Sequence, residues 1–314
     1  MLQIFLPLVA VAAAATPSAH TDLPIKMIEN GRGAKRFSVT IMVNGEPVEA
    51  ALDTGSVGLR IVAPALPAGA KATGRKARIG FNSGVMLEGS AVRVSVAFAG
   101  MNAKPVTVQR IDGASCRKEV PRCDAAGVKL SAFRIMSDGI PGEGFSAILG
   151  IGLRDDPIGH PLVQVGIDRW IVKLPRTPEE VGHLILNPTD AEVANYRMVA
   201  LLPHRNEIEG CLVTATKKLC APTAIDSGAP AITLFGTSAE DIPESRTSAM
   251  LALGSGEDDP KMPIIVGDRS EATLIRARPA RRDAESSMSF GIAPYMHWTI
   301  LYNSRARTLG VANR

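Results

Sequence analysis

Hydrophobic and polar residues alternate along several short stretches of this chain, as they do in strands that bury one face. The clearest pattern covers residues 37–52, where Asn44-Gly45 separates two alternating runs and predicts a hairpin whose second strand leads into Asp53. Other alternating stretches lie at 91–97, 105–108, 183–186, 198–202, 273–276 and 298–302. We therefore expect a fold made mainly of short strands.

Helical patterning is confined to three short segments at 161–167, 177–181 and 188–196, the last of which follows Asn187 in a cap-like position. These segments are too short to organise a fold. Because turn residues separate most of the strand-like stretches, we predict an all-β protein with sandwich-like or barrel-like sheets. A parallel sheet built from βαβ units is not expected.

Composition sets the scale of the fold and narrows the choice of partners. A chain of 314 residues with 46% hydrophobic residues is long enough for one large domain or two lobes of similar size. The formal net charge is only +4, and no Lys/Arg run is long enough to follow a phosphate backbone, so we expect no nucleic-acid partner. The short basic clusters at 75–76 and 278–282 are interpreted as solvated loops.

The first 19 residues resemble an export signal. They form an apolar run in which Ala13 and Ala15 precede Thr16, an arrangement typical of a cleavage site. The run has no basic start, which leaves a retained membrane anchor as the alternative, although the run is short and interrupted by a proline. No other apolar stretch approaches the length of a membrane span, so we expect a secreted or periplasmic protein without a stable span.

The four cysteines fall into two close pairs, and three pairings are possible. We favour the local bridges Cys116–Cys123 and Cys211–Cys220, which an oxidising compartment allows, over four free thiols. Neither pair has CxxC spacing, and the five histidines include no HExxH motif. We therefore expect neither a metal nor a cofactor.

Two similar segments, more than half the chain apart, carry the candidate chemistry. Each follows a small apolar strand end, and the two are the only Asp-[Ser/Thr]-Gly triplets in the chain. One such triplet is most simply an ordinary turn after a strand, but two in matched contexts indicate a site built from both halves. The segments are Asp53-Thr54-Gly55-Ser56 and Asp226-Ser227-Gly228-Ala229.

Two carboxyl groups within hydrogen-bonding distance share one proton, so that one can act as a base while the other acts as an acid. Such a pair can activate water for attack on a peptide carbonyl without a metal. The hydroxyl and glycine residues after each aspartate are expected to hold the carboxyl groups in place. Ala229 offers no hydroxyl where Ser56 offers one, which predicts an activity optimum less acidic than that of a gastric enzyme.

In these segments the chain resembles the pepsin-like family of aspartic peptidases. Residues 145–153, which contain Ile148-Leu149-Gly150, are similar to the family's hydrophobic-hydrophobic-Gly element, and residues 290–312 are similar to its closing pattern without the usual acidic residue. The resemblance implies a bilobal fold with about six strands in each lobe. The N-terminal lobe would cover 20–165 with Asp53, the C-terminal lobe 166–314 with Asp226, and the cleft would lie between them.

The family also has a β-hairpin flap over its substrate, and residues 79–84 are similar to it. The resemblance implies that Phe81, Asn82, Ser83 and Gly84 contact the substrate. Phe81 stands in the place of the family's flap tyrosine, and Arg60 in the place of the tryptophan that hydrogen-bonds to it. We expect a cation–π contact between Arg60 and Phe81, the alternative being a surface arginine beside a core phenylalanine.

We therefore predict a monomeric aspartic endopeptidase that hydrolyses extended polypeptide with a water activated between Asp53 and Asp226. The alternative is a catalytically weak or inactive pepsin-like envelope protein that binds peptide or polysaccharide in the cleft. A separation of about ten ångströms or more between the two carboxyl groups, several times the reach of a hydrogen bond, would exclude the site.

Overall fold

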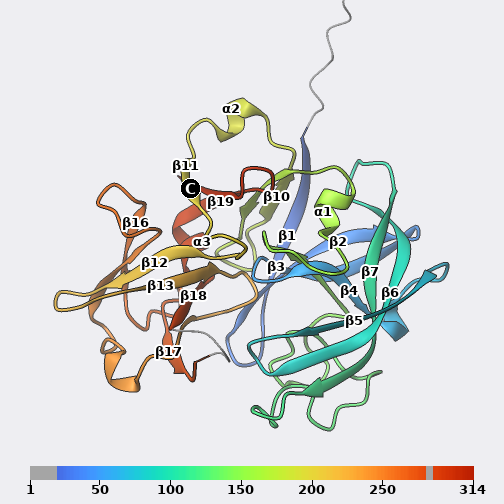
Figure 1. Cartoon of the computed structure of the whole chain (residues 1–314), viewed down its shortest axis with the longest axis horizontal. Helices are drawn as coiled ribbons and strands as arrows, with labels where there is room; N and C mark the ends of the chain where they lie inside the picture. Colours follow the sequence, from blue (N-terminus) through green and yellow to red (C-terminus); the bar gives the residue numbers. More distant parts are fainter. Residues whose placement is uncertain (1–19, 281–285) are drawn as a thin grey trace, which may run out of the picture.

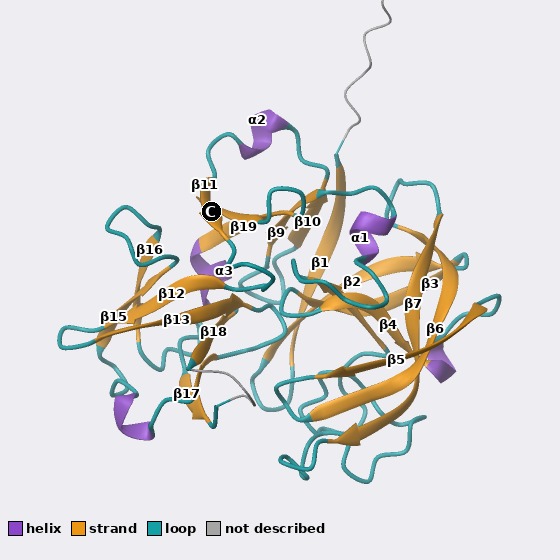
Figure 2. Ribbon diagram, viewed as in Figure 1, coloured by secondary structure: helices purple, strands orange, loops and turns teal. Residues whose placement is uncertain are grey.

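The computed structural model describes residues 20–280 and 286–314, so the predicted export signal at 1–19 and part of the basic cluster at 278–282 lie outside the described residues. Strands and loops make up most of the structure, as expected for a mainly β protein (Figure 2). The strands form two large sheets. Figure 1 shows β2 to β7 on the right and β12 to β18 on the left, with β1, β10 and β19 between them.

The first sheet has thirteen strands and contains the first of the two Asp triplets. Its strands, in spatial order, are β11 (Arg197–Ala200), β20 (Thr308–Asn313), β19 (Trp298–Asn303), β9 (Arg169–Lys173), β10 (Gly182–Leu186), β1 (Thr21–Glu29), β2 (Lys35–Val43), β3 (Glu46–Asp53), β8 (Ala147–Ile151), β4 (Val57–Val62), β7 (Lys104–Cys116), β6 (Val85–Ala97) and β5 (Lys71–Gly80). Strands from both ends of the chain therefore meet in one sheet.

The second sheet has seven strands and leads into the second triplet. In spatial order they are β16 (Lys261–Ile265), β15 (Ser248–Ala252), β12 (Ile208–Val213), β13 (Lys218–Ile225), β18 (Ser287–Gly291), β14 (Ile232–Phe235) and β17 (Ile275–Arg278). All seven strands come from one continuous part of the chain, after β11 and before β19.

The helices are as short as the sequence indicates. They are α1 (Pro161–Gln164), α2 (Asp190–Val193) and α3 (Ala293–His297), with 3-10 turns at Ala63–Ala65 and Ala239–Asp241. The first two lie within predicted helical segments, and the Thr189 and Glu192 side chains form a capping box that starts α2. The prediction for 177–181 was wrong, because this segment forms only bends and turns. None of the helices in 20–280 and 286–314 is long and apolar enough to cross a membrane.

The predicted hairpin at 37–52 is formed by β2 and β3, which pair antiparallel. Asn44 and Gly45 both have positive φ, at 48° and 86°, as a two-residue hairpin turn requires. The alternation in β2 buries Phe37, Val39 and Ile41 completely or nearly so. The hairpin therefore fixes the strand end that carries Asp53.

The two sheets contain the same local arrangement of strands, each beside one Asp triplet. In the first sheet β3 pairs parallel with β8, β8 antiparallel with β4, and β4 parallel with β7. In the second sheet β13 pairs parallel with β18, β18 antiparallel with β14, and β14 parallel with β17. Asp53 lies opposite Gly150, and Ile225, directly before Asp226, lies opposite Gly291. The backbone thus presents both aspartates at equivalent strand ends.

One hydrophobic cluster runs through both sheets and joins them. It contains Leu52 and Leu149 beside the first triplet and Ile225 and Phe290 beside the second. A smaller cluster, which includes Leu87 and Phe133, lies under the hairpin of β5 and β6. The strand ends that carry the triplets are therefore held by packed cores on both sides.

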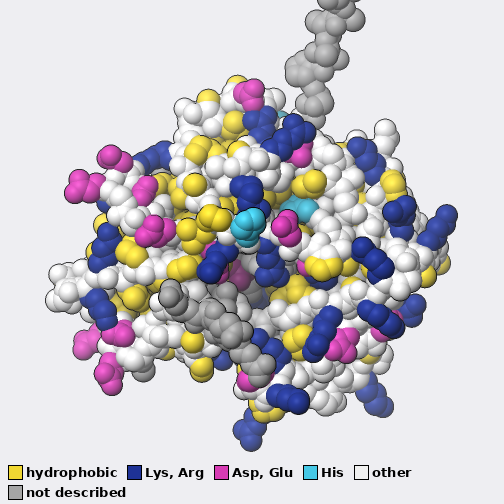
Figure 3. Space-filling view, viewed as in Figure 1, with side chains coloured by type: hydrophobic (Ala, Val, Ile, Leu, Met, Phe, Trp, Pro, Cys, Tyr) yellow, Lys and Arg dark blue, Asp and Glu magenta, His cyan; other side chains and the backbone are white. Residues whose placement is uncertain are grey.

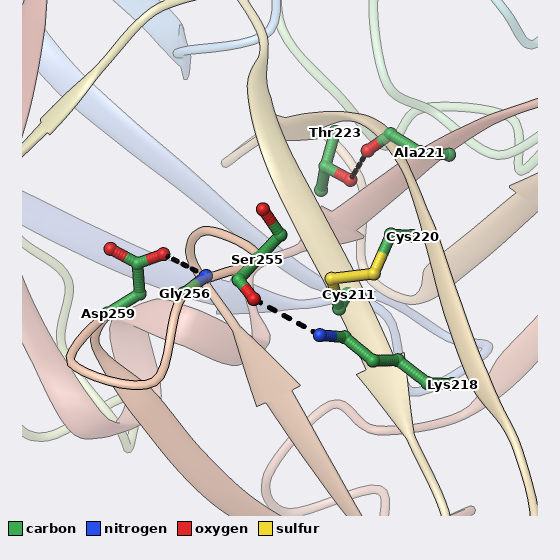
Figure 4. The surroundings of a disulfide bond; sticks show 8 residues. All are labelled: Cys211, Lys218, Cys220, Ala221, Thr223, Ser255, Gly256 and Asp259. Atoms are coloured by element: carbon green, nitrogen blue, oxygen red, sulfur yellow. Dashed lines mark hydrogen bonds between the residues drawn. A yellow bond between two sulfur atoms is a disulfide. The ribbon is translucent and has the colours of Figure 1, made fainter.

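Both predicted disulfides, Cys116–Cys123 and Cys211–Cys220, are present. The second joins residues that are directly opposite each other on β12 and β13 (Figure 4). Beside it the Lys218 ammonium donates to the Ser255 backbone carbonyl, which connects β13 to the neighbouring loop. The two bridges are compatible with an oxidising compartment such as the periplasm or the cell exterior.

Candidate active site

A cavity of about 480 Å³ is lined by the aspartate and the glycine of both Asp triplets. Figure 3 shows a hollow at the centre of this face, with Lys and Arg side chains on both sides and acidic side chains within it. Among the residues that line the cavity are Asp53, Gly55, Ser56, Asp226, Gly228 and Ala229, together with Gly80, Phe81, Asn82 and Ser83 from the end of the β5–β6 hairpin. The structure therefore brings the predicted triplets and flap to one site.

The two carboxyl groups are close together, as the prediction requires. A Cβ atom built on Gly228 would lie 2.9 Å from Asp53 Oδ1 and 3.1 Å from Asp226 Oδ1, so these two oxygens are no further apart than the sum of the two distances. The Asp226 carboxyl also shares a side-chain hydrogen bond with Asp53. The separation that would have excluded the site is not found.

Glycine is required after each aspartate because the two loops approach each other closely. A Cβ atom on Gly55 would lie 2.3 Å from Asp226 Cγ and 2.5 Å from both carboxyl oxygens. Real Cβ atoms essentially never approach other atoms so closely. A side chain at position 55 would therefore push Asp226 away.

Reciprocal hydrogen bonds join the two loops. The Thr54 backbone N–H donates to Ser227 Oγ at 3.0 Å, and the Ser227 backbone N–H donates to Thr54 Oγ1 at 2.9 Å. Each hydroxyl then donates to a strand-end carbonyl of the other loop, Thr54 to Ile225 at 3.0 Å and Ser227 to Leu52 at 2.8 Å. Both side chains are buried, so these bonds fix the relative positions of the carboxyl groups.

The two carboxyl groups receive different numbers of donors from their own loops. Asp53 accepts hydrogen bonds from the Gly55 N–H at 2.8 Å and from the Ser56 hydroxyl. Asp226 accepts one from the Gly228 N–H at 2.8 Å, and Ala229 has no hydroxyl to add a second. Burial and, secondly, the neighbouring Asp53 charge raise the pKa of Asp226. The arrangement favours a proton on Asp226.

Sequence reasoning missed several residues that support the loops. The Tyr295 hydroxyl lies 2.9 Å from Thr54 Oγ1 and is hydrogen-bonded in turn to the Tyr302 hydroxyl. The Asn206 side chain donates to the Thr54 carbonyl at 2.8 Å and accepts from the Leu153 N–H. Tyr295 and Tyr302 lie within the closing pattern at 290–312, but that pattern does not assign them to the site, and no motif marks Asn206.

Arg36 is a second group that the sequence did not reveal. Its guanidinium pairs with the Asp138 carboxylate and donates to the Gly228 carbonyl at 2.6 Å. The arginine lies on β2 and is only 6% exposed. Its positive charge also acts to lower the pKa of Asp226, against the larger effect of burial. Arg36 therefore ties the second Asp loop to the first sheet.

The predicted flap is the tip of the β5–β6 hairpin. Its turn is closed by hydrogen bonds from the Phe81 N–H to the Val85 carbonyl and from the Gly84 N–H to the Phe81 carbonyl. Phe81 is partly exposed and packs against the cluster that contains Leu87 and Phe133. The backbone of this hairpin therefore reaches the cavity wall beside the two aspartates.

The contact expected between Arg60 and Phe81 is not found among the described residues. Arg60 is 1% exposed, and its guanidinium binds the Asp156 carboxylate, the Gln109 side chain and the Val57 carbonyl. Burial lowers the pKa of Arg60, although Asp156 opposes this effect. Arg60 lies in the interior because β4 pairs with β7, which places this residue opposite Gln109. Neither expected alternative holds, since Arg60 is a buried structural residue.

Within the described residues, no cluster of three or more His, Cys, Asp or Glu side chains could hold a metal ion. The chain matches no protein-family model and no curated protein sequence. The site consists of two adjacent carboxyl groups, one with an extra donor and the other with a raised pKa, in a cavity beside a hairpin.

Proposed function

We propose that this chain is an aspartic endopeptidase with a pepsin-like, two-lobed fold. The observation that carries the proposal is the pair of close carboxyl groups, held by the reciprocal hydrogen bonds of Thr54 and Ser227 inside a cavity. The repeated strand arrangement around Asp53 and Asp226 supports two related lobes. Because both carboxyl groups come from one chain, a monomer is sufficient for activity.

In this mechanism a water molecule lies between ionised Asp53 and neutral Asp226. Asp53 takes a proton from the water as its oxygen bonds to the peptide carbonyl carbon, while Asp226 gives its proton to the carbonyl oxygen. In the second step the C–N bond breaks, the amine takes the proton from Asp53, and Asp226 recovers a proton from a hydroxyl of the intermediate. The site returns to its starting state, with one water consumed.

The assignment of the resting proton follows from the surroundings of each carboxyl group. Asp53 receives donors from Gly55 and Ser56, which stabilise a negative charge. The raised pKa of Asp226 suits the group that must carry the proton. The proton belongs to the pair as a coupled system, so the two groups act together in catalysis.

The substrate would be polypeptide in an extended conformation, lying across the cavity under the tip of the β5–β6 hairpin. Strand-like main-chain hydrogen bonds are a common way to bind such a segment. Closing the hairpin over the substrate would exclude water and strengthen the electrostatic effects of the carboxyl pair. The two disulfides fit a protein that is secreted or periplasmic.

The test is cleavage of a denatured protein from pH 2 to pH 8 by the wild type and by Asp53→Asn and Asp226→Asn variants. We expect cleavage by the wild type, with a maximum well above pH 2, and a fall of at least about 10³-fold in each variant, because each removes one half of the acid–base pair. Asp258→Asn, an exposed aspartate outside the cavity, is the matched control and should retain full activity.

A hydroxyl-containing transition-state mimic of the pepstatin type separates this proposal from the binding-protein alternative. The proposal predicts that the mimic inhibits cleavage and competes with substrate. Tight binding of the mimic without cleavage at any pH would instead favour a noncatalytic envelope protein that binds peptide in the cavity.

A further inference from the structure

Four arginines line the cavity without an ion-pair partner among the described carboxylates. They are Arg134, Arg154, Arg276 and Arg278. The guanidinium of Arg134 donates only to the backbone carbonyls of Ser131 and Phe133, and the other three arginines make no side-chain hydrogen bond within the described residues. These charges are therefore available to a ligand in the cavity.

Four of the five acidic residues that line the cavity are already paired with other groups. Asp138 pairs with Arg36, Glu207 pairs with Arg205, and Asp53 and Asp226 form the proposed catalytic pair. The remaining one, Asp124, is half-buried, and burial followed by the Asp138 charge raises its pKa. Six arginines and five carboxyl groups line the cavity, and Asp53 and Asp226 share one proton, so the walls carry a small net positive charge.

The unpaired arginines come from segments next to both sheets. Arg276 and Arg278 are two residues apart on β17, so their side chains lie on the same face of the strand. They pair in register with Thr233 and Phe235 of β14, which also line the cavity. Arg134 comes from the loop between β7 and β8 in the first sheet, and Arg154 follows β8. Basic side chains therefore reach the cavity from segments of both sheets.

We propose that the cavity selects acidic polypeptide, with Asp or Glu side chains near the scissile bond held by these arginines. The inference rests on the proposed function, since it names the substrate class of the same site. Guanidinium groups bind carboxylates with paired, directional hydrogen bonds, and a concave wall of one charge raises the local concentration of oppositely charged segments. An acidic peptide also avoids the repulsion that Lys or Arg side chains would meet here.

The experiment uses three labelled peptides with the same central sequence and with Glu, Lys or Gln at the flanking positions. The dissociation constant and kcat/KM of each are measured at pH 5.5, where Glu is ionised. We expect the Glu peptide to bind and to react about five- to tenfold better than the Gln peptide, as one or two exposed ion pairs would give, and the Lys peptide to be poorest. The preference should shrink as salt is raised.

The double variant Arg276→Gln, Arg278→Gln should lose most of the discrimination between the Glu and Gln peptides. The matched control is Arg93→Gln, an exposed arginine on β6 outside the cavity, which should keep both the discrimination and the basal activity. Equal affinity of the wild type for the Glu and Lys peptides would overturn the inference. So would tighter binding of a sulfated polysaccharide or an oligonucleotide than of the Glu peptide.

The binding and cleavage measurements separate this inference from the proposed function. Cleavage of all three peptides at equal rates would refute the acidic preference and leave the peptidase intact. Preferential binding of the Glu peptide with no cleavage of any peptide would refute the peptidase and support the acidic specificity of the cavity.

Discussion

The loop at Asp53 and the loop at Asp226 follow matching strands, β3 and β13. Beside each of these strands, three further strands pair one after another in the same parallel, antiparallel and parallel order. Their hydroxyl residues, Thr54 and Ser227, exchange equivalent hydrogen bonds. The frame that holds the carboxyl groups is therefore symmetric. Such a frame needs only small residues at the same positions of two distant segments.

The surroundings of the two carboxyl groups are not symmetric. Ser56 donates to Asp53, whereas Ala229 donates nothing from its side chain to Asp226. Arg36 reaches the Gly228 carbonyl of the second loop, while Asn206 reaches the Thr54 carbonyl of the first. The shared frame therefore sets the distance between the two carboxyl groups, and the neighbours that the loops do not share decide which group holds the proton.

Among the variants that keep both aspartates, the largest effect is expected from Gly55→Ala, which disturbs the shared frame. The new Cβ atom would lie 2.3 Å from Asp226 Cγ, so the carboxyl group must move. We expect kcat/KM to fall by at least about 100-fold, since small displacements of a catalytic group have effects of this size. Peptide cleavage assays check the loss, and circular dichroism checks that the variant folds.

Two further glycine variants sharpen this result. Gly228→Ala should be less severe, because its Cβ atom first meets the flexible end of Met136 at 2.8 Å and Asp53 Oδ1 at 2.9 Å. Gly113→Ala, where no atom lies within 4 Å of the new Cβ, should be neutral.

Full activity in Gly55→Ala would mean that the close approach of the loops is not needed for catalysis.

A smaller effect is expected from substituting Ser56 and Ala229, the positions at which the two loops differ. Ser56→Ala removes a donor to ionised Asp53, so the acidic limb of the pH profile of kcat/KM should move up by about one unit, which is roughly tenfold at pH 4. Ala229→Ser should add a donor to Asp226, lower its pKa and move the basic limb down. Ser95→Ala, exposed on β6, is the control. If the pH profile of kcat/KM is unchanged in both variants, Ser56 and Ala229 do not decide which carboxyl group holds the proton.

The parts of this site that were predicted from the sequence are those set by local pattern. Asn44-Gly45 marks the turn of the β2–β3 hairpin because few residues adopt positive φ, and the triplets stand out because they recur after strand ends. The disulfides could also be predicted from local pattern, because each closes a short loop. Local signals also misled at 177–181, where a helix-like run of five residues is too short to form a helix without tertiary contacts.

The parts that could not be predicted depend on which distant strands become neighbours. Arg60 was placed beside Phe81 on the basis of a family position, but the pairing of β4 with β7 buries it against Gln109 and Asp156. Arg36 and Tyr295 contact the Asp loops from another strand and from a helix, and nothing in the sequence indicates these contacts. Buried polar contacts of this kind follow from the tertiary fold, so a single sequence gives no signal for them.

The smallest effect is expected in stability, where the asymmetry of the pair should appear as a pH dependence. The pKa of Asp226 is raised by burial, so between the ordinary value of about 4 and the raised value the folded protein holds a proton that the unfolded chain has lost. The wild type therefore loses stability as pH rises through this window. Asp226→Asn stays neutral throughout and avoids the loss.

Thermal unfolding from pH 4 to pH 7 tests this sign. The Tm of Asp226→Asn should match that of the wild type near pH 4 and exceed it at pH 7 by about 2–6 °C, the shift expected for a difference on the order of 1–2 kcal/mol in a chain of this size. A difference in Tm that does not change with pH would place the proton elsewhere. A Tm difference that grows with pH would mean that the buried Asp226 carboxyl lowers the stability of the protein at neutral pH. A residue that served only the structure would not have this cost.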